Sequence, residues 1–129
     1  MLSDHDIDEL SERVLSRLLV DGATVTETAR ALVAEMAALR PDAPALLSVL
    51  PMSMAAAAIE GMLTNGQPRR IAPEAWRIAA LLAAETLSLH DRTSDAPAPT
   101  IAALWAHLRA DPQALGAAGP AAVPGISAP

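Results

Sequence analysis

Apolar residues recur every three to four positions along the first part of the chain, which is the spacing of one face of an α-helix. The first such stretch covers residues 4–19, with acidic and basic side chains filling the other positions. The second begins after Thr24 and closes at Arg40 and Pro41, and Thr24 has capping-box spacing to Glu27. The pattern therefore predicts two amphipathic helices.

The next two predicted helices are apolar on nearly every side. One should start near Asp42, be kinked or split at Pro51, and run to about Leu63, before the turn residues 65–66. The kink is expected because proline removes a backbone donor and crowds the preceding turn. The other is expected over Pro73–Leu89, with the proline at its first position, where proline is common.

A short fifth helix follows a predicted loop, residues 91–99, that is rich in proline and small polar residues. Thr100 is its expected N-cap, and Asp111 marks its end. Beyond it the chain is Ala, Gly and Pro with almost no charge, a composition that cannot form a packed core. The sequence predicts an all-α fold, a compact bundle of about five helices over residues 1–110 with a disordered tail over 111–129.

Two helices that are apolar on nearly every side are difficult to cover within one short chain. The other three predicted helices each offer one face, and large exposed apolar patches are uncommon on soluble monomers. We therefore expect part of this surface to be covered by a second copy or by another protein; a purely internal role in a monomer is the competing interpretation. The expected interface anchors are Leu50, Met54, Ile59, Met62, Trp76, Leu81 and Leu82.

Composition narrows the class of protein. The 129-residue chain is 52% hydrophobic, yet its only aromatic residues are two tryptophans, so the core must be aliphatic. It lacks cysteine, which excludes disulfides, thiolate ligands and cysteine nucleophiles. All nine basic residues are Arg, which with abundant Ala and Pro indicates a GC-rich bacterial genome. Because neither a basic leader nor an uninterrupted membrane-length apolar run is evident, we expect a cytoplasmic protein.

Charge argues against nucleic-acid binding by the N-terminal part. The net charge is −6, and residues 1–35 carry eight acidic and three basic side chains, a balance of −5. Such a surface repels phosphates. The one basic cluster is Arg69 and Arg70, with Arg77 farther along. These three residues are candidates for contact with a small anion, or for pairing with the acidic first helix.

A second functional class remains open from the sequence. Residues 24–36 resemble a helix of a helix-turn-helix unit, which would make the protein a small transcriptional regulator that uses this helix or the Arg69-Arg70 cluster. A recognition helix normally presents several basic or amide side chains outward, whereas Arg30 is the single cation here. We therefore rank this interpretation second.

No pattern in the sequence indicates catalysis, a metal or a cofactor. His5 lies between two aspartates, but neighbouring residues at a helix start point in different directions. Glu85 and His90 are five apart, which is not the spacing of known helical metal motifs. Glu60 shares a polar stripe and should be exposed. The preferred interpretation is a non-enzymatic helical protein–protein interaction module, a homodimer or a small subunit or adaptor of a larger bacterial assembly.

Overall fold

The computed structural model describes residues 2–62, 67–91 and 97–116, except for the side chains of residues 67, 68 and 91. The predicted turn at 65–66, most of the predicted loop and residues 117–129 of the predicted tail lie outside this part. The described chain is all-α, as predicted. Its elements are α1 (Asp4–Leu19), α2 (Val25–Leu39), the 3-10 helix η1 (Ala45–Ser48), α3 (Val49–Glu60), α4 (Gln67–Asp91), α5 (Ile101–Ala110) and the 3-10 helix η2 (Ala114–Gly116).

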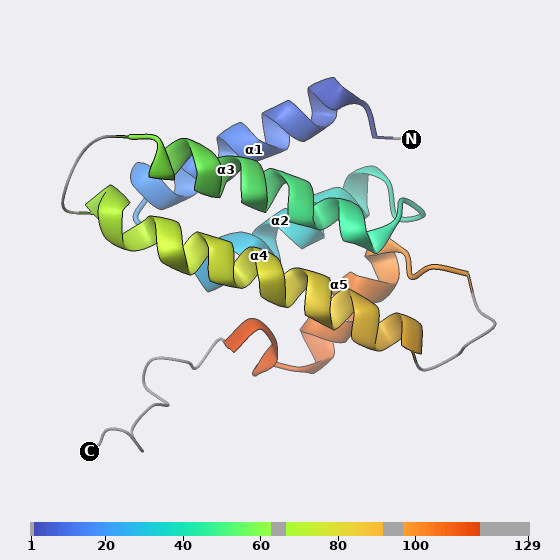
Figure 1. The fold of residues 1–129 in the computed structure, drawn as a ribbon. Coiled ribbons are helices and arrows are strands. Elements are labelled where there is room, and N and C mark those ends of the chain that lie inside the picture. Colours follow the sequence, from blue (N-terminus) through green and yellow to red (C-terminus); the bar gives the residue numbers. More distant parts are fainter. Residues whose placement is uncertain (1, 63–66, 92–96, 117–129) are drawn as a thin grey trace, which may run out of the picture.

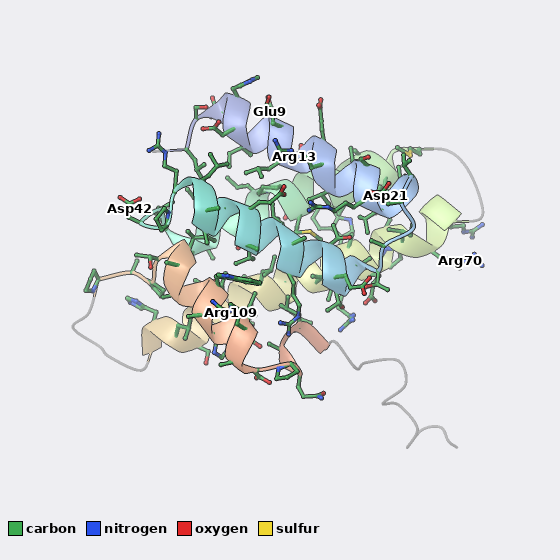
Figure 2. All side chains as sticks on the ribbon, turned by 180° about the vertical axis from the view of Figure 1, so that it is seen from behind. Glu9, Arg13, Asp21, Asp42, Arg70 and Arg109 are labelled. Carbon is green, nitrogen blue, oxygen red and sulfur yellow. The ribbon has the colours of Figure 1, made fainter. Side chains whose placement is uncertain are left out.

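The helices pack in two layers (Figure 1). α3 and α4 form an antiparallel pair in one layer, and their contact is the most extensive between any two described elements. α1, α2 and α5 form the other layer, which faces the viewer in Figure 2. α1 packs against α3, while α2 packs against α1 and α5. The described chain therefore covers the α3–α4 pair on one side only.

The core between the layers is aliphatic, as the composition requires. Its large fully buried side chains come from every α-helix and include Leu10, Leu32, Met52, Ile78 and Leu104. Buried alanines lie among them on α3 and α4, where small side chains permit close approach of the two helices. Among the described residues the buried cluster holds no aromatic side chain, although a partly buried tryptophan of α5 packs against it.

Caps expected from the sequence define two helix starts. Thr24 Oγ1 accepts a hydrogen bond from the Glu27 amide at 3.0 Å, and the Glu27 carboxylate accepts one from the Thr24 amide at 3.3 Å. This completes the predicted capping box of α2. Thr100 caps α5 through the amide of Ala103 at 3.2 Å. Side-chain caps of this kind satisfy amides that have no acceptor inside the helix.

The predicted helix from Asp42 is wrong in its first half. Pro44 instead forms an isolated β-bridge with Thr100, and the 3-10 helix η1 follows it. Pro51 does not kink a helix, because it is the third residue of α3, where a backbone N–H would have no helical acceptor. The helix starts beside this proline and ends at Glu60.

The predicted start of α4 is also wrong. The helix begins at Gln67, six residues before the expected start at Pro73, which lies inside it. Pro68 already occupies the first turn, where a missing N–H is harmless. Pro73 lies one turn farther on, so only the carbonyl of Arg69 loses its helical donor there. This segment contains two prolines suited to the first turn of a helix, and the helix begins one residue before the earlier one.

The chain continues to pack against the bundle beyond Asp111, which corrects the predicted start of the tail. Leu115 in η2 is 1% exposed. The guanidinium of Arg30 on α2 donates to the carbonyl oxygens of Leu108 at 2.6 Å, Asp111 at 2.9 Å and Ala114 at 3.1 Å. These partners lie 78 to 84 positions from Arg30 along the chain. Sequence patterns detect local periodicity, so they could not reveal this contact.

Replacing Arg30 with Met should destabilise the fold, because three carbonyl groups at the end of α5 and in η2 lose a charged donor. We expect the free energy of unfolding to fall by about 2 kcal/mol, measured by urea unfolding followed by circular dichroism. Arg13→Ala is the control, since Arg13 is 52% exposed in its ion pair with Glu35. It should cost less than about 1 kcal/mol. Equal losses in the two variants would contradict the role of Arg30.

The start of α1 should be sensitive to acid. The Ser3 backbone N–H donates to Asp6 Oδ2 at 3.0 Å, and this hydrogen bond holds the pKa of Asp6 below its ordinary value of 3.8. Because the folded pKa is lowered, the stabilisation is present above about pH 4 and is lost as the pH falls through the folded pKa. Thermal unfolding of the natural chain and of Asp6→Ala should differ at neutral pH, and the difference should shrink toward about pH 3. A difference independent of pH would contradict this.

Candidate interaction surface

The seven predicted interface anchors do not share one environment. Four are between 38% and 45% exposed, namely Leu50, Met54, Met62 and Trp76. Ile59 and Leu82 are 1% and 0% exposed, so the prediction that they anchor an interface is wrong and they belong to the core. Each follows an exposed anchor by five or six positions, which rotates the side chain by more than about 100° around the helix. That rotation carries both toward the other layer.

The second layer leaves the outer side of the α3–α4 pair uncovered (Figure 1). The exposed apolar residues of α3 and α4 recur at helical spacing, which places them on this side. Of the eight large hydrophobic residues most exposed in the described chain, six belong to residues 46–87. Exposed or half-buried alanines fill the intervening turns. We define the α3/α4 face as Leu46, Leu50, Met54 and Ala57 on the η1–α3 side, and Trp76, Ala80, Ala83 and Leu87 on α4.

The η1 end of this face is hollowed. An open groove of about 590 Å³ has almost entirely apolar walls, formed by Pro44, Leu46, Leu47, Val49, Leu50 and Ala83. We call it the Ala83 groove, because this small residue is the part of its wall that α4 contributes. A smaller hollow of about 160 Å³ shares Pro44 and Leu46 with it and reaches Leu87 and His90. The two hollows make this end of the face concave.

The opposite end carries the largest side chain of the face. Trp76 is 39% exposed, and its indole Nε1–H donates to Glu60 Oε1 at 3.3 Å, which links α4 to α3. Glu60 is exposed, as predicted. Because a tryptophan N–H requires a partner when it is buried, this hydrogen bond lets the ring be covered by apolar atoms without a lost donor. The face thus has a bulky aromatic ring at one end and a hollow at the other.

The predicted basic cluster is not assembled as one anion site by the contacts of the described residues. Arg77 donates from Nε to Glu74 Oε1 at 3.0 Å, and this hydrogen bond raises the pKa of the Arg77 guanidinium. Arg69 and Arg70 are exposed in the first turn of α4, and Arg70 projects away from the bundle (Figure 2). Anion contact by these two stays a prediction, whereas Arg77 already has an anionic partner.

The helix considered for DNA recognition has its one cation engaged elsewhere. Arg30 is the only basic residue of α2, and its guanidinium is bound to carbonyl groups at the end of α5. Glu35 of the same helix pairs with Arg13 at 3.2 Å and Arg17 at 3.3 Å on α1. α2 therefore offers phosphate no uncommitted cation, which weakens the alternative prediction without testing it.

Glu85 has a partner that the sequence spacing did not suggest. Its Oε1 lies 2.6 Å from His107 Nε2 on α5, and both side chains are largely buried, at 25% and 20% exposure. Leu81 lies one turn before Glu85 on this flank of α4, about 140° around the helix from Trp76. Leu81 is therefore half-buried against the core and lies outside the α3/α4 face.

If Glu85 and His107 serve only to join α4 to α5, their removal should affect stability as one unit. Glu85→Gln and His107→Ala should each reduce the free energy of unfolding by about 1 kcal/mol, and the double variant by about as much as the larger single loss. Urea unfolding of the four chains measures the coupling. Strictly additive losses would show that the two side chains do not act together.

Nothing among the described residues suggests a metal site, since no three histidine or acidic side chains come close enough to share an ion. No described helix combines the length and apolar character needed to cross a membrane. Comparison of the chain with protein-family models, with curated proteins and with solved structures finds no match.

Proposed function

We propose that this protein is a non-enzymatic helical interaction module that forms a homodimer through its α3/α4 face. The observation that supports the proposal is that five of the eight most exposed large hydrophobic residues of the described chain belong to this face, namely Leu46, Leu50, Met54, Trp76 and Leu87. Leaving such a contiguous patch in water is unfavourable, and patches of this kind mark interaction surfaces. The second layer, which would otherwise cover α3 and α4, already packs on their other side.

The area of the face comes close to the area that a stable dimer buries. The segment from Leu46 to Met62 extends roughly 25 Å, and two helices side by side are about 20 Å wide. The footprint is thus on the order of 500 Å² per copy, and the accessible area of a ridged helical surface exceeds its footprint. This approaches the roughly 800 Å² per partner of a stable interface.

Charge favours a second copy in this orientation. Each chain carries a net charge of −6, and the N-terminal residues that hold most of the excess acid form α1 and α2 in the other layer. A contact between two α3/α4 faces leaves both acidic layers on the outside, far from each other. Contact through α1 would bring like charges together. Two α3–α4 pairs stacked in this way give a four-helix packing arrangement, a common way to bury apolar helix faces.

Charge placed on the face should prevent dimerisation without unfolding the chain. Leu50→Asp and Met54→Asp put a carboxylate on an exposed part of the face, so we expect a monomer with unchanged helicity. Val20→Asp is the control, because Val20 is 78% exposed at the end of α1. It should dimerise like the natural chain. Ile59→Asp, by contrast, should unfold the protein, since Ile59 is buried.

Sedimentation velocity measures the mass of each variant in solution. The natural chain is expected at twice the monomer mass of 13.3 kDa. A natural chain that stays monomeric at high micromolar concentration would overturn the homodimer. Dimers of Leu50→Asp and Met54→Asp as stable as those of the natural chain would overturn the α3/α4 face as its interface.

A further inference from the structure

We propose that the two copies interlock reciprocally, with the Trp76 ring of each copy seated in the Ala83 groove of the other. The inference rests on the homodimer proposed above and adds its register. Its basis is the arrangement of the face, which carries a bulky ring at one end, a hollow at the other and small residues between them.

Symmetry brings the ring and the groove together. When two copies pack face to face, a two-fold axis lies in the plane of the interface. If that axis crosses α4 near Ala80, the partner's α4 runs antiparallel, and positions before Ala80 lie opposite positions after it. Trp76 precedes Ala80 by four residues and Ala83 follows it by three, which are displacements of about 6 Å and 4.5 Å. One axis therefore makes both ring-to-groove contacts at once.

The small residues at the centre allow the copies to approach closely. Ala57 lies one turn before Glu60 on α3, and Ala80 lies one turn after Trp76 on α4. Because Trp76 contacts Glu60 and the helices are antiparallel, these two alanines lie near each other at the middle of the face. Alanine contacts favour the short end of the 8–10 Å range of helix separations. A short separation is what a ring at the rim needs to enter the opposite groove.

The chemistry of the ring suits the groove. The groove walls are aliphatic carbon from η1, the start of α3 and Ala83, so they offer an indole no hydrogen-bond acceptor. The indole needs none from them, since its N–H already donates to Glu60 of its own chain. Glu60 is exposed and can stay at the rim in contact with water. Burial of the ring then removes apolar area from water and leaves no polar atom without a hydrogen-bond partner.

Two variants separate the ring from the groove. Trp76→Ala removes the ring and keeps the groove, whereas Ala83→Phe fills the groove and keeps the ring. Each alone should weaken dimerisation at least about tenfold in sedimentation equilibrium, as expected for truncating or blocking an aromatic hot spot. Helicity close to that of the natural chain confirms that each variant is folded.

The decisive measurement is the equimolar mixture of the two variants. In a mixed dimer, the intact ring of the Ala83→Phe copy enters the intact groove of the Trp76→Ala copy, and at the other site the filled groove faces an alanine. One of the two contacts is restored without a clash. We therefore expect the mixture to dimerise more tightly than either variant alone. A mixture that associates no better than its components would overturn the interlocking.

A fluorescence measurement leaves the face unchanged and so does not depend on the folding of Ala83→Phe. In Trp105→Phe, Trp76 is the only fluorophore, and its emission should shift to shorter wavelength as rising concentration drives dimerisation. An emission maximum that stays constant while the protein dimerises would overturn the seating of the ring and leave the homodimer intact. Absence of dimerisation in the natural chain would instead overturn the homodimer itself.

Discussion

The antiparallel packing of α3 against α4 is the contact on which the rest of the structure depends. Both helices are apolar on most sides, so burying one side of the pair against α1, α2 and α5 still leaves apolar residues on the other. The same packing sets the Trp76 ring beside Glu60 at one end and opens the Ala83 groove at the other. Core and candidate interface are thus opposite sides of one helix pair.

The lack of aromatic residues in the core strengthens this constraint. Without Phe or Tyr, the interior is filled by Leu, Ile, Val, Met and many alanines, which lets the helices pack closely. Aromatic side chains are therefore rare in this chain, and an exposed one calls for an explanation. Trp76 is one of two aromatic residues in the whole chain, and it is placed at the surface. A bulky apolar ring in that position is consistent with a role outside the core.

Polar contacts join helices of the second layer to one another and to this pair. Arg30 fastens the end of α5 and η2 to α2 through three carbonyl groups, and Glu85 joins α4 to α5 through His107. Both contacts join residues that are far apart along the chain, 78 positions for Arg30 and Leu108 and 22 for Glu85 and His107, so local spacing could not reveal them. Because Arg30 and Glu85 bind other residues of the fold, neither side chain is free to bind a partner. The apolar α3/α4 face is the surface best suited to a function.

The sequence by itself determined the all-α class, the extents of α1 and α2, the caps at Thr24 and Thr100 and the excess of apolar surface on α3 and α4. These features follow from local periodicity and from side chains that bond to backbone a few positions away. Only the tertiary structure decided which apolar residues face inward. Ile59 and Met54 are both apolar and lie on one helix, yet Ile59 is in the core and Met54 is at the surface. The side on which neighbouring helices pack decides which apolar residues are buried. The sequence of a helix that is apolar on all sides does not indicate that side.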